Sequence, residues 1–217
     1  MPARASSTHV ELILGRALYY IISFMLNPSD TDIYWSRLYD NGRDFTLISS
    51  STLTKLLSFA DHTSPKTCLD IGCGTGQLTR ELYHRGYQCV GTDASASAVR
   101  LASQLTVAPH DQLQYMQFDI EQDDAAKLPQ QNYSLITCKL VYAFIKDKPA
   151  FIKHVKQLLA PGGTFVVITP YVDDTPTERR GIAVDDSELQ LLAAAFRQEA
   201  LYKGNEPGGA LTYFIGR

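Results

Sequence analysis

Short apolar runs alternate with helical patterns along the chain from residue 67 onward. The apolar runs predict five strands, over residues 67–71, 88–92, 112–118, 133–138 and 164–169. The intervening patterns predict three helices, one as far as residue 85 and two over residues 95–105 and 147–160. Strands that alternate with helices predict a parallel sheet with helices on both faces.

The C-terminal part of the chain has a different pattern. A charged stretch over residues 173–186 is followed by apolar positions, from Leu189 to Phe196, that predict one more helix. Residues 198–203 and 210–215 then predict a β-hairpin, with a long loop over the glycine-rich residues 204–209. The hairpin would add one antiparallel strand to the sheet.

An apolar segment near the N-terminus, residues 17–26, is too short to cross a membrane, since a spanning helix needs about 20 apolar residues. Asn27 and Pro28 follow it, where a signal peptide would have a small-residue cleavage site. The pattern predicts a helix that packs on the domain and stops before Pro28. A membrane-surface anchor and a helix that binds a partner remain alternatives.

Length and composition predict a single domain over residues 1–217. The chain has 217 residues, of which 45% are hydrophobic and 20% charged, so a disordered, collagen-like or coiled-coil protein is excluded. A net charge of −3 and a pI near 5.9 argue against binding to a nucleic-acid backbone, which needs a basic excess. The four cysteines, Cys68, Cys73, Cys89 and Cys138, form no C-x-x-C pair. They predict reduced thiols in a cytoplasmic protein and no metal site.

A glycine-rich loop joins the first predicted strand to its helix. Gly72, Gly74 and Gly76 stand at every second position, which lets the backbone lie in contact with a ligand. The spacing differs from the G-x-G-x-x-G of dinucleotide-binding proteins, and no Gly-Lys-Ser/Thr follows as in a P-loop. The loop therefore favours a nucleoside that carries something other than phosphate.

Two acidic residues follow the next two strands. Asp93 comes 17 residues after Gly76 and would accept both ribose hydroxyls, as in dinucleotide folds; the alternative is a cap on the helix near Ser95. Asp119 ends the third strand, where it could hold an adenine edge or serve the fold alone. The end of the fourth strand, with Tyr142, should line the place where the reactive end of the ligand meets a substrate.

Residues 67–169 resemble the class I S-adenosylmethionine-dependent methyltransferases. Leu-Asp-Ile-Gly-Cys-Gly-Thr-Gly from Leu69 is similar to the family's first motif, Gly-Thr-Asp to its second and Phe-Asp-Ile to its third. Residues 133–141 and 159–167 resemble the fourth motif and fifth strand. The resemblance implies an α/β fold, a Rossmann-like doubly wound sheet of seven strands in the order 3-2-1-4-5-7-6 with strand 7 antiparallel.

The resemblance also implies how S-adenosylmethionine would be held. Asp70 would orient the methionyl amino group, Asp93 would hold the ribose, and Asp119 the adenine amine. Lys139 could orient an anionic substrate or extend from the strand end to solvent. The whole implied donor-binding set is Asp70, Gly72, Cys73, Gly74, Gly76, Asp93, Ala94, Asp119, Ile120 and Lys139.

The acceptor is expected to be a small molecule. The family's nucleic-acid amine methylases have Asn/Asp-Pro-Pro-Tyr/Phe after strand four, whereas this chain has Lys139-Leu-Val-Tyr142. Residues 1–60, a helical extension, and the loop at the start of residues 171–217 are expected to set specificity. Tyr142 and Tyr171 are the candidate catalytic residues. Aromatic side chains are concentrated in the N-terminal extension. They predict a lid over the donor, or else a helix that packs its aromatic side chains on the sheet edge. The candidate lid residues are Tyr34, Trp35, Tyr39 and Arg43.

The sequence thus predicts an S-adenosylmethionine-dependent methyltransferase of the EC 2.1.1 class. It would methylate oxygen or nitrogen of a small metabolite by in-line transfer, as a monomer or homodimer with no nucleic-acid partner and no membrane span. A non-catalytic nucleoside-binding module for regulation or assembly is one alternative. A nicotinamide-dependent reductase is another, which the loop spacing disfavours.

Overall fold

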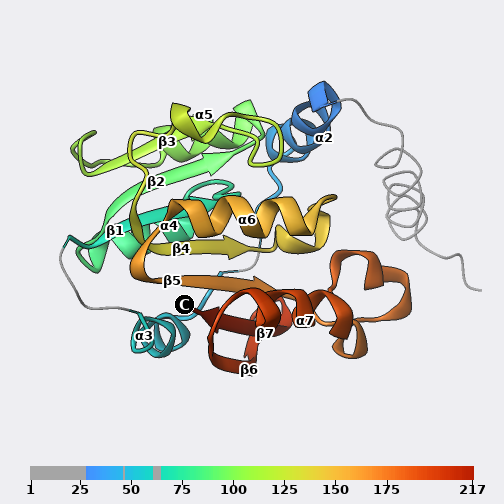
Figure 1. Ribbon diagram of the computed structural model, residues 1–217. Helices are drawn as coiled ribbons and strands as arrows, with labels where there is room; N and C mark the ends of the chain where they lie inside the picture. The colour runs from blue at the N-terminus through green and yellow to red at the C-terminus, as the bar shows by residue number, and fades with distance from the viewer. Residues whose placement is uncertain (1–27, 46, 61–64) are drawn as a thin grey trace, which may run out of the picture.

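The computed structural model describes residues 28–45, 47–60 and 65–217 (Figure 1). The helix predicted over residues 17–26 lies outside this part of the chain. The strands, in chain order, are β1 (Thr67–Ile71), β2 (Gln88–Asp93), β3 (Leu113–Gln117), β4 (Tyr133–Lys139), β5 (Leu159–Thr169), β6 (Gln198–Glu206) and β7 (Gly209–Gly216). They form one sheet in the order β3-β2-β1-β4-β5-β7-β6, in which β7 is antiparallel to β5 and β6. The predicted fold is confirmed.

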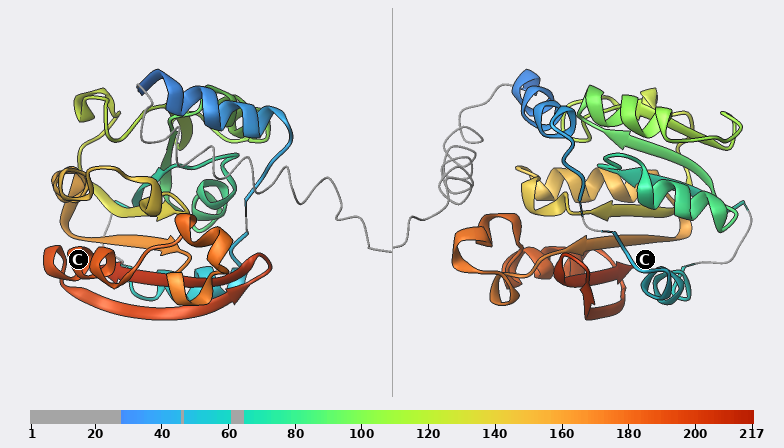
Figure 2. Two further views of the ribbon diagram at one scale, coloured as in Figure 1. Left: turned by 90° about the vertical axis from the view of Figure 1, so that its right-hand side faces the viewer. Right: turned by 180° about the vertical axis from the view of Figure 1, so that it is seen from behind.

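Helices cover both faces of the sheet. The α-helices are α2 (Pro28–Asp40), α3 (Ser50–Leu57), α4 (Gln77–His84), α5 (Ala96–Gln104), α6 (Lys148–Leu158) and α7 (Asp186–Ala195). The 3₁₀ turns in the described residues are η1 (Ala125–Lys127), η2 (Tyr142–Phe144), η3 (Val172–Asp174) and η4 (Thr177–Ile182). Figures 1 and 2 show α3, α4 and α5 on one face and α6 and α7 on the other. Right-handed crossovers on either side of β1 dictate this division.

Several helices begin where the sequence supplies capping side chains, although α4 begins after Gly76 without one. Ser95 accepts from the Ala98 amide at the start of α5, and Asp147 caps α6. Asp185 and Glu188 form a reciprocal capping box at α7. Each cap satisfies an amide that would otherwise lack a partner in the first turn.

Two regions differ from the sequence prediction by more than two residues. The prediction of a long hairpin loop is wrong, because Glu206 pairs with Gly209 and a two-residue turn joins β6 to β7. The helix predicted to Ala160 ends at Leu158, and β5 already begins at Leu159 with an irregular register against β4. In the hairpin, backbone pairing extends into glycine-rich residues, whereas β5 begins at the Tyr133–Leu159 pair, ahead of its two glycines.

The core lies in two layers, one on each face of the sheet. Leu69, Ile136 and Phe165 pack with α6 and α7, whereas Cys68 and Val166 pack with α3 and α4. All four cysteines are free and buried. In the described parts of the chain, no helix combines the length and the apolar character needed to cross a membrane.

Glu206 joins the terminal hairpin to α3. Its carboxylate accepts hydrogen bonds from the Ser49 amide (2.9 Å), the Thr52 hydroxyl (2.6 Å) and the Tyr213 hydroxyl (2.9 Å). Burial by itself raises the pKa of Glu206, but these donors outweigh it and hold the pKa below its ordinary value. The carboxylate therefore stabilises the fold above the ordinary glutamate pKa, and this contribution is lost as the pH falls.

We expect Glu206→Ala to lower the free energy of unfolding by about 3 kcal/mol, because three donors lose a charged acceptor. Urea unfolding followed by circular dichroism measures the change. Glu178→Ala, at an exposed position of η4, is the matched control and should change it by less than about 0.5 kcal/mol. Equal effects of the two variants would contradict the assigned role.

Candidate functional site

The loop after β1 is shaped by three glycines in the left-handed region. Gly72, Gly74 and Gly76 have φ values of 66°, 55° and 78°, which other residues rarely adopt. A Cβ atom on Gly72 would collide with the Val141 side chain, and one on Gly74 would lie 2.7 Å from the Tyr39 hydroxyl oxygen. The loop therefore presents backbone to its surroundings where the resemblance places the methyl donor.

Tyr115 of β3 supports this loop, a role that the sequence interpretation missed. Its ring lies over Gly91 of β2, where an added Cβ would come within 2.6 Å of a ring carbon. The Tyr115 hydroxyl donates to the Gly76 carbonyl (3.3 Å) and accepts from Thr106 (3.2 Å). The available signal was a glycine in the middle of a strand, which often marks the close approach of another group.

Asp93 lies at the end of β2 and holds the loop in place. One carboxylate oxygen accepts from the Gly74 amide (2.9 Å) and the other from the Ser95 amide (2.9 Å). The side chain is buried, and burial raises its pKa to about 6, although the two amides oppose the shift. Each oxygen retains a lone pair, so both can accept a further hydroxyl proton. The Ser95 contact also shows that the alternative interpretation holds in part, since Asp93 supports the start of α5.

Asp70 lies one layer deeper, on β1. Its carboxylate accepts from the hydroxyls of Thr79 (2.6 Å) and Thr137 (2.8 Å), and burial raises its pKa. Lys139, at the end of β4, provides an opposite charge nearby. Asp70 therefore connects β1, β4 and α4, and its orientation of the methionyl amino group stays a prediction.

Residues at the ends of β2 and β3 lie side by side. Asp93 pairs with Gln117, whose side chain also donates to the Ala94 carbonyl (3.1 Å). Asp119 and Ile120 follow β3, with Ile120 buried in the core and the Asp119 carboxylate accepting from the Glu121 amide (2.9 Å). The structure thus brings the residues of the implied adenine end together at one edge of the sheet.

The predicted lid residues lie on and after α2. Tyr39 is buried against the loop, and burial together with Asp93 raises the pKa of its hydroxyl. The Trp35 ring makes edge contacts with Tyr34 (5.1 Å between centroids), Phe45 (6.0 Å) and Phe144 (5.2 Å). Arg43, in contrast, is exposed.

Two acidic residues of this N-terminal segment were not identified from the sequence. The Asp44 carboxylate accepts from the Thr75 hydroxyl (3.1 Å), which joins the segment to the glycine loop. The Asp32 carboxylate accepts from Ser36 (2.7 Å) and from the Ala96 amide (2.9 Å) at the start of α5. These contacts hold α2 beside α5 at the edge where the parallel strands end, as both views in Figure 2 show.

The two candidate catalytic tyrosines face α7. Tyr142 is completely buried in the core, and its hydroxyl donates to the Glu188 carbonyl (3.1 Å). Tyr142 begins η2, and its ring packs in the core; its catalytic role stays a prediction. The Tyr171 hydroxyl donates to Asp186 (2.7 Å), and Lys203 lies over its ring. Its catalytic role stays a prediction.

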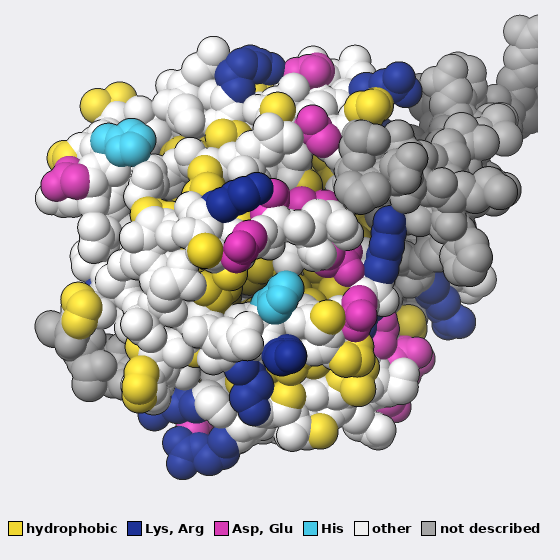
Figure 3. All heavy atoms as spheres, turned by 45° about the horizontal axis from the view of Figure 1, so that its top comes forward, with side chains coloured by type: hydrophobic (Ala, Val, Ile, Leu, Met, Phe, Trp, Pro, Cys, Tyr) yellow, Lys and Arg dark blue, Asp and Glu magenta, His cyan; other side chains and the backbone are white. Residues whose placement is uncertain are grey.

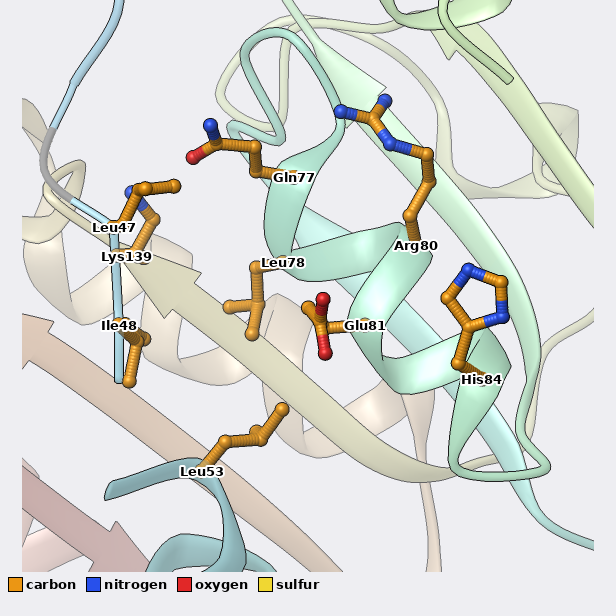
Figure 4. Close-up of a pocket in the computed structure, with 9 residues that line it drawn as sticks. All are labelled: Leu47, Ile48, Leu53, Gln77, Leu78, Arg80, Glu81, His84 and Lys139. Carbon is orange, nitrogen blue, oxygen red and sulfur yellow. The ribbon is translucent and has the colours of Figure 1, made fainter. Parts of the chain in front are cut away.

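A groove of about 190 Å³ lies beside the glycine loop, between α4 and residues 47–53 (Figure 4). We call it the α4 groove. Its lining residues are Leu47, Ile48, Leu53, Gln77, Leu78, Arg80, Glu81, His84 and Lys139. Its inner end reaches Lys139 at the end of β4, so a molecule in the groove would lie close to the loop.

Known proteins share both the sequence pattern and the fold. A family described as methyltransferase domain matches residues 43–203. The ubiquinone biosynthesis O-methyltransferase of Bradyrhizobium sp. (strain ORS 278) is 34% identical over 101 residues, 46% of this chain and 38% of that protein. The enzyme of the same name from Klebsiella pneumoniae (strain 342) is 32% identical over 98 residues, 45% of this chain and 40% of that protein. The chain thus spans about two fifths of the length of these curated relatives.

Solved structures share the fold at low sequence identity. TehB from Haemophilus influenzae has a TM-score of 0.62 at 19% identity, over 86% of this chain and 66% of that chain. The N-methyltransferase NodS from Bradyrhizobium japonicum WM9 has a TM-score of 0.60 at 22% identity, over 77% of this chain and 92% of that chain. The match over residues 43–203 includes the glycine loop, Asp93, Asp119 and Lys139. The chain belongs to the methyltransferase domain family, as the motif resemblance predicted.

Proposed function

We propose that this protein is an S-adenosylmethionine-dependent methyltransferase that methylates oxygen or nitrogen of a small molecule. The observation that carries the proposal is the contact between Asp93 and the Gly74 amide. It places an acceptor-rich carboxylate against a backbone loop at the edge where the parallel strands end. Ligands of open α/β sheets bind at this edge. The names of the relatives, O-methyltransferase and N-methyltransferase, support the choice of acceptor atoms.

The residues present suit this donor from end to end. The ribose hydroxyls would donate to Asp93, and the adenine would lie between Ala94 and Ile120 with its amine at Asp119. The left-handed glycines leave room for the methionyl part beside the loop, and the loop has no lysine to neutralise a phosphate. The carboxylates of Asp70 and Asp44, both near Lys139, suit a cationic donor better than an anionic one.

The donor supplies a methyl group that its sulfonium already activates, so the protein mainly aligns and shields the reactants. Tyr39 and the aromatic contacts of Trp35 would exclude water from the loop side of the site. Asp44 would hold these aromatic residues over the loop through its hydrogen bond with the Thr75 hydroxyl. The lid residues would thus shield the reactants from water, and this role requires no proton transfer from them.

A small-molecule acceptor also agrees with the charges of the chain. On the face shown in Figure 3, Lys and Arg side chains are interspersed with Asp and Glu and form no broad basic patch. The four cysteines are free and buried, which supports a reducing, cytoplasmic setting. We further propose that the protein acts as a monomer or homodimer without nucleic acid.

Calorimetry with S-adenosylhomocysteine tests the proposal. We expect binding in the micromolar range, together with transfer of labelled methyl groups from S-adenosylmethionine to a metabolite of a cell extract. Binding without transfer would favour a regulatory nucleoside-binding module. Binding of NADH in place of S-adenosylhomocysteine would favour the reductase, and absence of all binding would overturn the proposal.

A further inference from the structure

Leu140 has an unusual backbone conformation just after β4. It follows Lys139, which lies at the tip of the β4 arrow in Figure 4. Its φ is 60°, and every other residue with a positive φ in the described part of the chain is a glycine. This left-handed conformation brings the Cβ atom too close to the following carbonyl oxygen, so residues with a side chain rarely adopt it. Backbone strain of this kind clusters at functional sites.

Contacts on both sides hold Leu140 in this conformation. Its amide donates to the Ile168 carbonyl of β5 (2.7 Å), which continues the pairing of Lys139 with Ile168. Its half-buried side chain packs against the core layer of α3 and α4. Tyr142, two residues further on, is buried in the other core layer. The chain is thus fixed before and after Leu140, and the strain persists because the surroundings determine the backbone.

The left-handed residue changes which face of the sheet the next side chains reach. Within β4, Leu135 packs in the layer of α3 and α4, and Ile136 packs in the layer of α6 and α7. A regular strand would place residue 140 on the face of Ile136 and residue 141 on the opposite face. The structure has the reverse arrangement. Leu140 packs with the layer of Leu135, and Val141 packs with the layer of Ile136.

This reversal places Val141 against the glycine loop. A Cβ atom on Gly72 would collide with Val141 Cγ2, so the valine side chain fills the space that a side chain at residue 72 would need. Val141 is only half-buried, which leaves part of its apolar surface accessible. The methionyl part of the donor is expected beside this loop, so it would lie against Val141.

We propose that Leu140 is a positioning residue of the donor site, and that its left-handed backbone holds Val141 against Gly72 at the methionyl end of the donor. This inference rests on the proposed function and adds a residue to its donor site. An ordinary backbone at Leu140 turns Val141 towards the opposite core layer. The donor then loses an apolar contact, and the loop loses the side chain that packs on its first glycine.

Two substitutions of similar size separate the backbone of Leu140 from its side chain. Leu140→Asn introduces a residue that tolerates the left-handed region but removes the apolar side chain. Leu140→Ile keeps the apolar volume but is β-branched, and the left-handed region is a genuine outlier for such residues. We expect Leu140→Ile to weaken S-adenosylhomocysteine binding about tenfold in calorimetry. Leu140→Asn should bind within about twofold of wild type, although loss of apolar burial lowers its urea midpoint of unfolding.

Leu159→Ile is the matched control. Leu159 is also half-buried, but it has an ordinary φ of −74° on β5, where a β-branched residue is well accommodated. Its S-adenosylhomocysteine affinity should stay within about twofold of wild type. Circular dichroism shows whether each variant is folded. Leu140→Val, which is β-branched but smaller, makes the same test if Leu140→Ile does not fold.

A double-mutant cycle tests whether Leu140 acts through Val141. Val141→Ala alone should weaken S-adenosylhomocysteine binding, because the apolar contact with the donor is lost. In the Val141→Ala background, Leu140→Ile should have little further effect, since the side chain that the backbone positions is then absent. A merely structural role of Leu140 would instead make the two effects additive.

The outcomes separate this inference from the proposed function. Wild-type affinity in a folded Leu140→Ile variant, or equal weakening by Leu140→Asn and Leu140→Ile, would overturn the role of the left-handed backbone. Full additivity with Val141→Ala would overturn the route through Val141. In each of these cases the wild type still binds S-adenosylhomocysteine, and the proposed function stands. Failure of the wild type to bind it would overturn the proposed function and this inference together.

Discussion

Replacing Asp93 by alanine is expected to weaken S-adenosylhomocysteine binding by at least about hundredfold. Two ribose hydroxyls would lose a charged acceptor, and each such hydrogen bond contributes about 1.5–3 kcal/mol. The Gly74 amide would also lose its partner, so the loop would no longer be held in its binding conformation. Isothermal titration calorimetry of wild type and variant measures the difference in affinity.

Asp111→Ala provides the control for this substitution. Asp111 is exposed and precedes β3, so its replacement should leave the affinity within about twofold. Thermal melts of both variants separate a loss of binding from a loss of folded protein. A folded Asp93→Ala variant that binds S-adenosylhomocysteine as tightly as wild type would show that Asp93 does not bind the ribose.

The pH dependence gives an independent measure of the same carboxylate. Burial raises the pKa of Asp93 from 3.8 to about 6. Its contribution to stability is therefore fully present below pH 4 and is lost as the pH rises through about 6. Ribose hydroxyls would donate to the ionised form, so S-adenosylhomocysteine affinity should increase about tenfold from pH 5 to pH 7.5. In Asp93→Asn the part of this dependence due to residue 93 should disappear.

Most of the fold was predictable because each strand and helix has a local pattern. The central part of β5, residues 165–168, is a continuous apolar run, and Gly72 follows β1 where the chain must turn. The strand order, however, came from the motif resemblance, since apolar runs carry no information about which strand lies next to which. The hairpin loop was predicted too long because Gly204 and Asn205 indicate a turn locally, whereas pairing with β7 keeps both of them in the strand.

The candidate site was predictable where backbone chemistry dictates the residue type. Left-handed loop positions require glycine, and Asp93 follows from its place after β2. Side-chain direction was not predictable in the same way. Tyr142 follows the correct strand, but η2 turns its ring into the core. The contact of Asp44 with Thr75 joins residues 31 positions apart, and no local pattern encodes it.

Replacing Gly76 by alanine should lower the free energy of unfolding by about 2–4 kcal/mol, through two separate costs. The first is the left-handed backbone, which costs a side-chain residue about 1 kcal/mol. The second is collision with Tyr115, whose hydroxyl oxygen lies 2.5 Å from the position of the new Cβ. Overpacking of this kind costs about 1–3 kcal/mol. Urea unfolding measures the total.

Two further glycines separate these costs. Gly86 has a similar φ of 87° with no atom within 4 Å of an added Cβ, so Gly86→Ala should cost only about 1 kcal/mol. Gly91→Ala has no left-handed strain but meets the same Tyr115 ring at 2.6 Å, and should cost about 2 kcal/mol. Adding Tyr115→Leu should recover part of the loss in Gly91→Ala, because the smaller side chain leaves room for the methyl group. Equal losses in Gly76→Ala and Gly86→Ala would show that backbone strain alone requires glycine in the loop and that Tyr115 has no part in it.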